Sequence, residues 1–296
     1  MILVLGNGFL GKSLSTYFET NKIIYKIADK KFLKSTSDHQ LFFNLNHSET
    51  FEDIFKDIDT VIHLIHPTVP ANSQFNSNID LDYNIKSNEI LLEHIIDQKI
   101  KKVIFVSTGG AVYGHPEYLP IDEKHPVNPI SNYGKGKLIL EQLFIDKCSK
   151  NNIVLKIIRP SNIFGKYQET NKPQGAIAHI IECIKKNQPF HIWGNGLDKK
   201  DYLYAADFSA GINCVLSNFN SKNMIYNLSS GTGYSLNEII LHIEMLLNKK
   251  LTVVYENEKE FDVKNILLSN QLFRDDFNWK VNFNLQDGLN DFLKTN

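Results

Sequence analysis

The chain has few cysteines, no excess of charge of either sign and no long apolar run. Its cysteines, Cys148, Cys183 and Cys214, are far apart and form no Cys-x-x-Cys pair, so neither a disulfide framework nor a zinc ribbon is expected. The 32 basic and 33 acidic residues disfavour a protein that binds nucleic acid or anionic lipid. No apolar run approaches the roughly 20 residues of a membrane helix, and the first residues lack the charged start of a signal peptide. We therefore expect a cytoplasmic protein.

The sequence instead alternates short apolar segments with helical patterns. Its 296 residues suffice for one large domain or two fused lobes. In the first part of the chain, apolar runs predict strands at Ile2–Leu5, Ile23–Ala28, Leu41–Phe43, Thr60–Leu64, Lys102–Ser107 and Ile153–Ile158. Helices are predicted between them at Gly11–Thr20, Asn78–Gln98 and Tyr133–Asn151. Apolar strands that alternate with helices favour an α/β fold with a parallel sheet covered on both faces.

A glycine-rich turn follows the first predicted strand and opens the first predicted helix. Its sequence, Gly6-Asn-Gly8-Phe9-Leu10-Gly11, fits the Gly-x-Gly-x-x-Gly fingerprint of dinucleotide-binding proteins. Gly8 lets a pyrophosphate approach the backbone, and Gly11 lets the helix pack closely on the strand. The free N–H groups of the helix N-terminus then face the phosphates. The alternative is a plain glycine turn.

Asp29 ends the second predicted strand, 18 residues after Gly11. An acidic residue at about this distance accepts hydrogen bonds from the adenosine ribose and repels a 2′-phosphate, which favours NAD over NADP. The neighbouring Lys30 and Lys31 leave room for NADP, and a solvated turn aspartate is the alternative interpretation.

After residue 165 the pattern changes to loops around one predicted helix, Gly175–Lys186. Two segments, Asp201–Leu216 and Met224–Ser229, are expected to return to the sheet, and a helix (Leu236–Leu247) and a strand (Leu251–Tyr255) follow. We assign residues 1–165 to an NAD-binding Rossmann domain, to which residues 201–231 return. Residues 166–200 and 232–296 are assigned to a substrate-binding lobe.

Tyr133 and Lys137 lie four residues apart, so a helix would place both side chains on one face. A tyrosine with its ordinary pKa of about 10 is a poor base at neutral pH. A nearby lysine cation stabilises the phenolate and lowers that pKa, so the pair can take a proton from a sugar hydroxyl. A surface helix pair with no function is the alternative.

Further motifs occur in order along the chain: Ser107-Thr-Gly-Gly-Ala-Val-Tyr113-Gly114, Arg159-Pro-Ser-Asn162-Ile-Phe-Gly165 and Asp201-Tyr-Leu-Tyr-Ala-Ala-Asp207. Together with the glycine turn and Tyr133-x-x-x-Lys137, they resemble the extended short-chain dehydrogenase/reductases, specifically the NAD-dependent epimerase/dehydratase family that acts on nucleotide sugars. The resemblance covers nearly the whole chain. It implies a Rossmann-type doubly wound parallel sheet with a smaller C-terminal substrate-binding lobe, bound NAD, a nucleotide-diphosphate sugar as ligand and a homodimer.

The resemblance also implies roles for single residues. Tyr133 matches the general base, and Lys137 matches its partner, which also binds the nicotinamide ribose. Asn162 matches the residue that reaches the nucleotide-sugar phosphates. Further residues match positions that contact the cofactor or orient the site: Asn44 and Leu45 beside adenine, Leu64 and Ile65 at a strand end, and Asn84 on the following helix.

The chain departs from the family pattern at several positions. Gly109 stands where the family usually has its catalytic Ser or Thr, so Thr108 is the candidate catalytic hydroxyl and Ser107 a candidate substrate contact. Alternatively, the hydrogen bond that such a hydroxyl makes to the sugar is absent in this protein. Lys200 and Lys259 replace family arginines, and each keeps the charge that a diphosphate needs without the bidentate fork of arginine.

The favoured interpretation is an NAD-dependent nucleotide-sugar 4-epimerase acting on a UDP-hexose-type substrate. A nucleotide-sugar 4-keto reductase with the same residues is the main alternative, and a non-catalytic dinucleotide-sensing protein is a weaker one. A dehydratase would need an Asp-Glu pair where Gly110 and Ala111 stand. No metal site is expected, because His63 and His66 lack an accompanying carboxylate or cysteine cluster.

Overall fold

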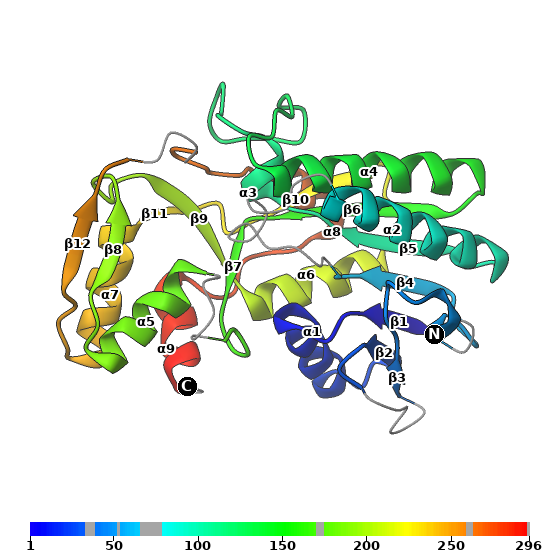
Figure 1. The fold of residues 1–296 in the computed structure, drawn as a ribbon, viewed down its shortest axis with the longest axis horizontal. Coiled ribbons are helices and arrows are strands. Elements are labelled where there is room, and N and C mark those ends of the chain that lie inside the picture. Colours follow the sequence, from blue (N-terminus) through cyan, green and yellow to red (C-terminus); the bar gives the residue numbers. More distant parts are fainter. Residues whose placement is uncertain (33–38, 52–53, 66–78, 170–174, 259–262, 295–296) are drawn as a thin grey trace.

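The computed structural model describes residues 1–32, 39–51, 54–65, 79–169, 175–258 and 263–294. Its main feature is a seven-stranded sheet in which all strands are parallel (Figure 1). In spatial order the strands are β10 (Ile225–Leu228), β6 (Val154–Pro160), β5 (Lys102–Val106), β4 (Thr60–His63), β1 (Ile2–Leu5), β2 (Tyr25–Asp29) and β3 (Gln40–Phe42). From β1 the strand order runs outward in one direction through β2 and β3 and in the other through β4, β5 and β6. Ligands of open α/β sheets bind at such a switch point, here between β1 and β4. The predicted doubly wound fold is confirmed.

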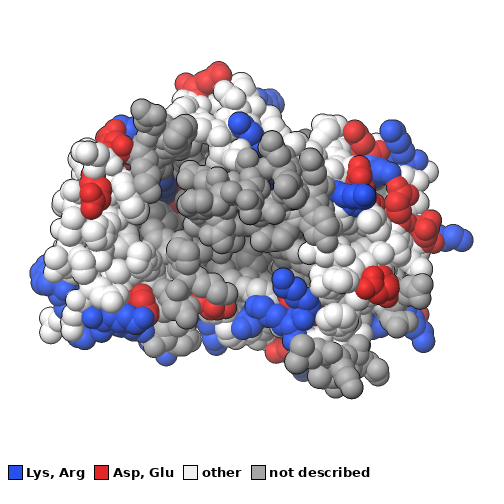
Figure 2. Space-filling model, in the orientation of Figure 1, with Lys and Arg blue, Asp and Glu red and all other residues white. Residues whose placement is uncertain are grey.

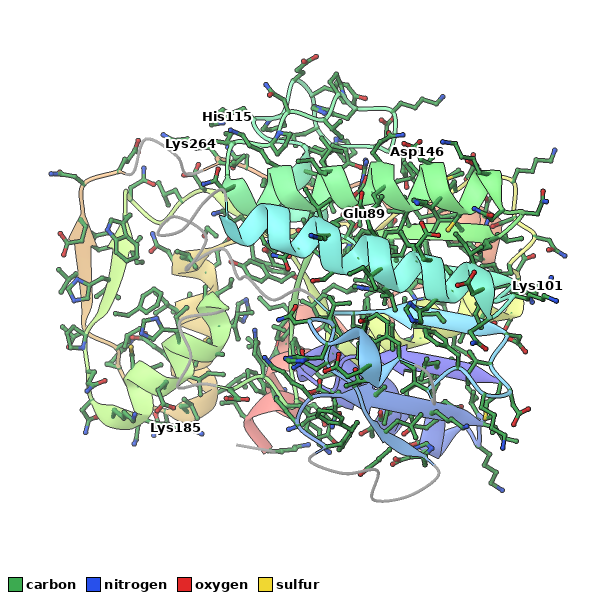
Figure 3. The ribbon with its side chains drawn as sticks, turned by 45° about the vertical axis from the view of Figure 1, so that its right-hand side comes forward. Glu89, Lys101, His115, Asp146, Lys185 and Lys264 are labelled. Atoms are coloured by element: carbon green, nitrogen blue, oxygen red, sulfur yellow. The ribbon has the colours of Figure 1, made fainter. Side chains whose placement is uncertain are left out.

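Helices cover both faces of this sheet because its strands are apolar on both sides. Leu3 and Leu5 pack toward α2 (Ile79–Asp97) and α4 (Asn132–Lys150), whereas Val4 between them packs toward the opposite face. That face carries α1 (Phe9–Thr20), α6 (Ala205–Ser217) and α8 (Gln271–Phe277). Figures 1 and 3 show α2 and α4 side by side, and an ion pair between Glu93 and Lys147 joins them.

A smaller lobe has its own apolar core, formed by one face each of three helices (Figure 1, left). The helices are α5 (Ala176–Lys186), α7 (Leu236–Leu247) and α9 (Leu285–Lys294). A parallel pair, β8 (Phe190–Trp193) and β12 (Val253–Glu256), packs on them. A three-stranded sheet of β11 (Gly233–Ser235), β9 (Lys199–Tyr204) and β7 (Asn162–Phe164) leads from this lobe to the large sheet. Two short helices, η1 (Ser48–Thr50) and α3 (Gly109–Val112), complete the elements described.

One expectation about the large sheet needs correction. The segment Asp201–Leu216 does not return to it as a strand, because β9 pairs with β7 and β11 in the separate three-stranded sheet. Only the following helix α6 packs on the large sheet, and β10 then joins its edge beside β6.

The described surface is mixed in charge. On the face shown in Figure 2, lysines and arginines are interspersed with acidic residues. Among the described residues, no helix is both long and apolar enough to cross a bilayer.

Candidate active site

A cavity of about 740 Å³ runs from the carboxyl ends of β1, β2 and β4 to the smaller lobe. Its wall contains nearly all the residues that the sequence predicts for the site. These are Gly6, Gly8, Phe9, Leu10, Gly11, Asp29, Asn44, Leu45, Leu64, Ile65, Ser107, Thr108, Tyr133, Lys137, Asn162 and Lys200.

The glycine turn gives the cavity an uncapped helix N-terminus. Helix α1 begins at Phe9, and no side chain caps its first N–H groups. A Cβ on Gly8 would meet no atom within 4 Å, so this backbone is open to a ligand. A Cβ on Gly11 would lie 1.9 Å from the carbonyl oxygen of Gly6, so only glycine permits this close packing. Both features fit a dinucleotide pyrophosphate.

Asp29 lies beside this turn at the end of β2. Its carboxylate accepts hydrogen bonds from the backbone N–H of Asn7 at 2.5 Å and of Lys31 at 2.9 Å. These bonds fix the carboxylate at the cavity wall, where each oxygen retains a second lone pair for a ribose hydroxyl. Lys30 and Lys31 line the same end of the cavity.

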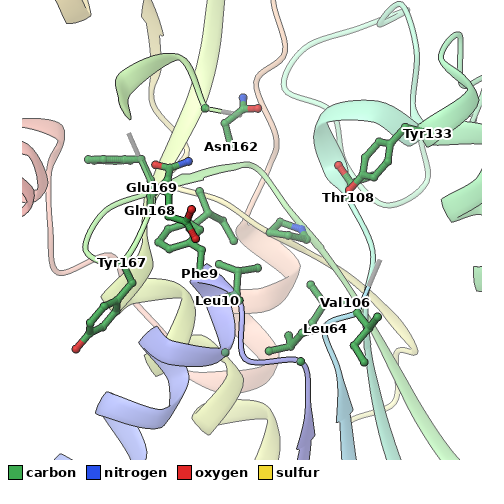
Figure 4. A pocket seen from close by; sticks show the side chains of 18 of the residues that line it. Phe9, Leu10, Leu64, Val106, Thr108, Tyr133, Asn162, Tyr167, Gln168 and Glu169 are labelled. Atoms are coloured by element: carbon green, nitrogen blue, oxygen red, sulfur yellow. The ribbon is translucent and has the colours of Figure 1, made fainter. Parts of the chain in front are cut away.

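At the other end, Thr108 and Tyr133 point toward each other (Figure 4). Thr108 follows β5 and occupies the N-cap position of α3 without a capping hydrogen bond from its side chain. Tyr133 lies in the first turn of α4, where Ser131 accepts a hydrogen bond from Gly134 N at 3.1 Å. The Thr108 hydroxyl hydrogen-bonds to the Tyr133 phenol. A side chain on Gly109 could not replace it, because a Cβ there would lie 2.3 Å from Leu268 Cδ1.

Lys137 is buried one turn after Tyr133 and donates a hydrogen bond to the Val106 carbonyl oxygen at 2.9 Å. Burial lowers the pKa of Lys137 to about 7, and the negative charge of Glu141 opposes this shift. Burial raises the pKa of Tyr133 to about 12, and the hydrogen bond from Thr108 opposes that rise. In this structure burial dominates the Tyr133 pKa, and Lys137 is not among the groups that shift it, so the lowering of this pKa by Lys137 stays a prediction.

Asn162 and Lys200 come from strands of the three-stranded sheet. Asn162 begins β7, and its Nδ2 donates to the backbone carbonyl oxygen of Asp201 on β9 at 3.0 Å; Lys200 of the same strand also lines the cavity. Ser107 also lines the cavity, but its buried hydroxyl donates to the Glu141 carboxylate. The structure therefore does not support a substrate contact by the Ser107 hydroxyl.

Two predicted residues do not belong to the described wall. Asn84 is 5% exposed inside the protein, where its backbone carbonyl oxygen accepts from Asn88 Nδ2; a cofactor contact by Asn84 stays a prediction. Lys259 lies outside the described residues.

Sequence reasoning missed the part of the wall that the smaller lobe and its connecting loop supply. It includes Tyr167, Gln168, Glu169, Trp193 and Asp198. Tyr167 has a positive φ of 73° and contacts the Thr16 hydroxyl on α1 at 2.9 Å, which holds this loop against α1. No motif marks these residues, because tertiary packing alone brings them to the cavity.

Comparison with known proteins agrees with this geometry. A model of the NAD dependent epimerase/dehydratase family matches residues 2–229. The chain belongs to this family. A Methanocaldococcus jannaschii protein provisionally described as a UDP-glucose 4-epimerase is 33% identical over 235 residues, 79% of this chain and 76% of that protein. The chain also matches an Escherichia coli dTDP-4-dehydro-6-deoxyglucose reductase at 27% identity, over 100% of this chain and 96% of the reductase.

The solved structure of a Thermotoga maritima UDP-glucose 4-epimerase with UDP-glucose has the same fold as the chain described here. Its TM-score is 0.90 at 25% identity, with 99% of this chain and 97% of that chain covered. The chain therefore shares the whole epimerase architecture, including the smaller lobe.

Proposed function

We propose that this chain is an NAD-dependent 4-epimerase of nucleotide sugars of the UDP-hexose type. One observation carries the proposal. A single cavity joins an open glycine turn with Asp29 at one end to the hydrogen-bonded Thr108 and Tyr133 at the other. The relatives described as UDP-glucose 4-epimerases support it. In this proposal, residues 1–165 and 201–231 hold the cofactor, and residues 166–200 and 232–296 hold the substrate.

The chain's own residues would position the sugar and move one proton. Tyr133 takes the proton of the C4 hydroxyl, and the Thr108 hydroxyl orients the reacting oxygen. Lys137, when charged, stabilises the phenolate form of Tyr133 that accepts this proton. Bound NAD supplies the acceptor for the C4 hydride. Asn162 and Lys200 would hold the diphosphate while the 4-keto sugar turns to present its other face for hydride return.

Nuclear magnetic resonance of a reaction without added reduced cofactor tests this proposal. The protein as purified should convert UDP-glucose or UDP-N-acetylglucosamine into its 4-epimer. Tyr133→Phe should lower kcat by at least about 10²–10⁴-fold while NAD binding remains, because the variant loses only the proton acceptor. A Tyr133→Phe protein with near-normal kcat would overturn the assignment of the base.

A 4-keto reductase is the second candidate. The E. coli reductase matches this chain over its whole length. In addition, the pKa of about 12 keeps Tyr133 a neutral phenol at pH 7, which suits proton donation to a keto oxygen. A non-catalytic sensing role is disfavoured because Tyr133 and Lys137 are both present. A homodimer through the paired helices α2 and α4 stays a prediction, which sedimentation would test.

A further inference from the structure

A buried ion pair lies directly behind the candidate active site. Glu141 lies on α4, one turn after Lys137, and Arg159 lies on β6. The guanidinium group binds both carboxylate oxygens, with Nε to Oε1 at 3.0 Å and Nη2 to Oε2 at 2.6 Å. The two side chains are only 2% and 4% exposed. Burying two charges is costly, and apolar residues often replace such pairs without loss of stability. Stability alone is therefore a weak explanation for this pair.

The pair holds both ends of the segment that carries Thr108. At one end, the Ser107 hydroxyl donates to Glu141. At the other end, Arg159 Nη1 donates to the Tyr113 hydroxyl at 3.0 Å, and that hydroxyl donates to Asn227 Oδ1 at 2.7 Å. The short helix α3 lies between these two anchors. The position of the Thr108 hydroxyl relative to Tyr133 therefore depends on the pair.

The negative charge of Glu141 also acts on Lys137 and raises the pKa of its amine. The groups around Lys137 are the Val106 carbonyl oxygen and the Phe105 ring on β5, His63 on β4, and Tyr133 and Glu141 on α4. His63 is kept neutral, because burial and the Lys137 charge lower its pKa to about 3. Among these groups, Glu141 is the carboxylate that favours the charged form of Lys137.

We propose that Glu141 and Arg159 are positioning residues for the reaction: the pair fixes the Thr108 segment against Tyr133. This inference rests on the proposed roles of Thr108, Tyr133 and Lys137. Neither Glu141 nor Arg159 lines the cavity, so both act through these three residues.

Three variants test the inference in the protein with its bound cofactor. Glu141→Gln keeps the shape and removes the charge. We expect kcat to fall by about 10- to 100-fold, because a catalytic group that is displaced from its place lowers the rate by about this factor. KM should change little. The pKa with which Lys137 enters the pH profile of kcat should move to lower pH, because the variant removes the negative charge that raises it. Ser107→Ala cuts one anchor and leaves the ion pair intact. It should lower kcat rather than raise KM, whereas a substrate contact by Ser107 would raise KM.

The double variant of Glu141→Met with Arg159→Met separates positioning from stability. Its melting temperature should be close to that of the wild type, but kcat should stay low. Lys156→Met is the control, since it removes another buried cation of β6, bonded to the Ser221 and Asn223 carbonyl oxygens. This control should cost stability without moving the pH profile.

Wild-type kcat in Ser107→Ala, or wild-type kcat and pH profile in the double variant, would overturn the inference. If Tyr133→Phe is inactive in the same assay, the proposed function survives that result. If Tyr133→Phe is active, the proposed function fails as well. Should both Glu141 variants fail to fold, the kcat and KM of Ser107→Ala decide.

Discussion

At the scale of single residues, the decisive position is the one that places a hydroxyl beside Tyr133. The sequence shows that Gly109 has no hydroxyl and that Thr108 precedes it, but it does not show which way either residue points. In the structure Gly109 packs against Leu268, and the Thr108 hydroxyl meets the Tyr133 phenol. This contact supports the proposal that Thr108 supplies the hydroxyl expected at Gly109.

Thr108→Val removes that hydroxyl and leaves a side chain of nearly the same shape. We expect kcat to fall by about 10²-fold, as the loss of one preorganised donor costs, with little change in NAD affinity. Steady-state kinetics and a fluorescence titration with NAD would measure both.

Gly109→Ser is the companion variant. It should lower the melting temperature and fail to raise kcat, because its Cβ would lie 2.3 Å from Leu268 Cδ1. A stable and faster Gly109→Ser protein would contradict this account.

The buried charge of Lys137 predicts a pH dependence of stability. In the unfolded chain its pKa is the ordinary 10.5, whereas in the folded protein it is about 7. Between these values the unfolded chain binds a proton that the folded protein does not, so this residue destabilises the fold most below pH 7 and least above pH 10.5. The gain in unfolding free energy caused by Lys137→Met should therefore shrink as pH rises from 7 to 10. Urea unfolding at several pH values would measure it, and a difference independent of pH would refute the shifted pKa.

At the scale of elements, the turn between β1 and α1 combines two separable functions. Gly11 allows the helix to approach the strand, whereas Gly8 leaves the backbone open to the cavity. The sequence predicts both functions from the fingerprint alone, because strand, turn and helix are contiguous in the chain.

Alanine substitutions separate these functions. Gly8→Ala should weaken NAD binding and leave the melting temperature nearly unchanged, since its Cβ meets no protein atom within 4 Å. Gly11→Ala should lower both, since its Cβ would overlap the Gly6 carbonyl oxygen. Thermal unfolding without ligand and calorimetric titration with NAD would show the difference. Equal losses of stability in the two variants would argue against the separation.

At the scale of the whole molecule, local sequence predicts the helices of both lobes and the strands of the large sheet, but not which strands pair in the three-stranded sheet. Strand β1 and helix α7 have the predicted bounds, because each is a local apolar pattern with a clear end. The partners of β9 could not be predicted, since pairing with β7 and β11 is decided by residues far away in sequence. For the same reason, the sequence does not show that Tyr167 and Trp193 line the cavity, because they reach it only when the two lobes fold together.

The same limit applies to the chemistry of the site. The spacing of Tyr133 and Lys137 predicts their common helix face, but not how deeply each is buried. Burial sets the direction of both pKa shifts, and it depends on the strands and helices that surround α4.

The central claim is that the hydride removed from the sugar returns to it within one turnover. The most direct test is to follow absorbance at the reduced nicotinamide band while the conversion of a UDP-hexose is measured in parallel. The account predicts many turnovers to the 4-epimer per protein molecule with no net consumption of reduced cofactor. Product that forms only with one NADH or NADPH consumed per sugar would contradict it and identify a 4-keto reductase instead.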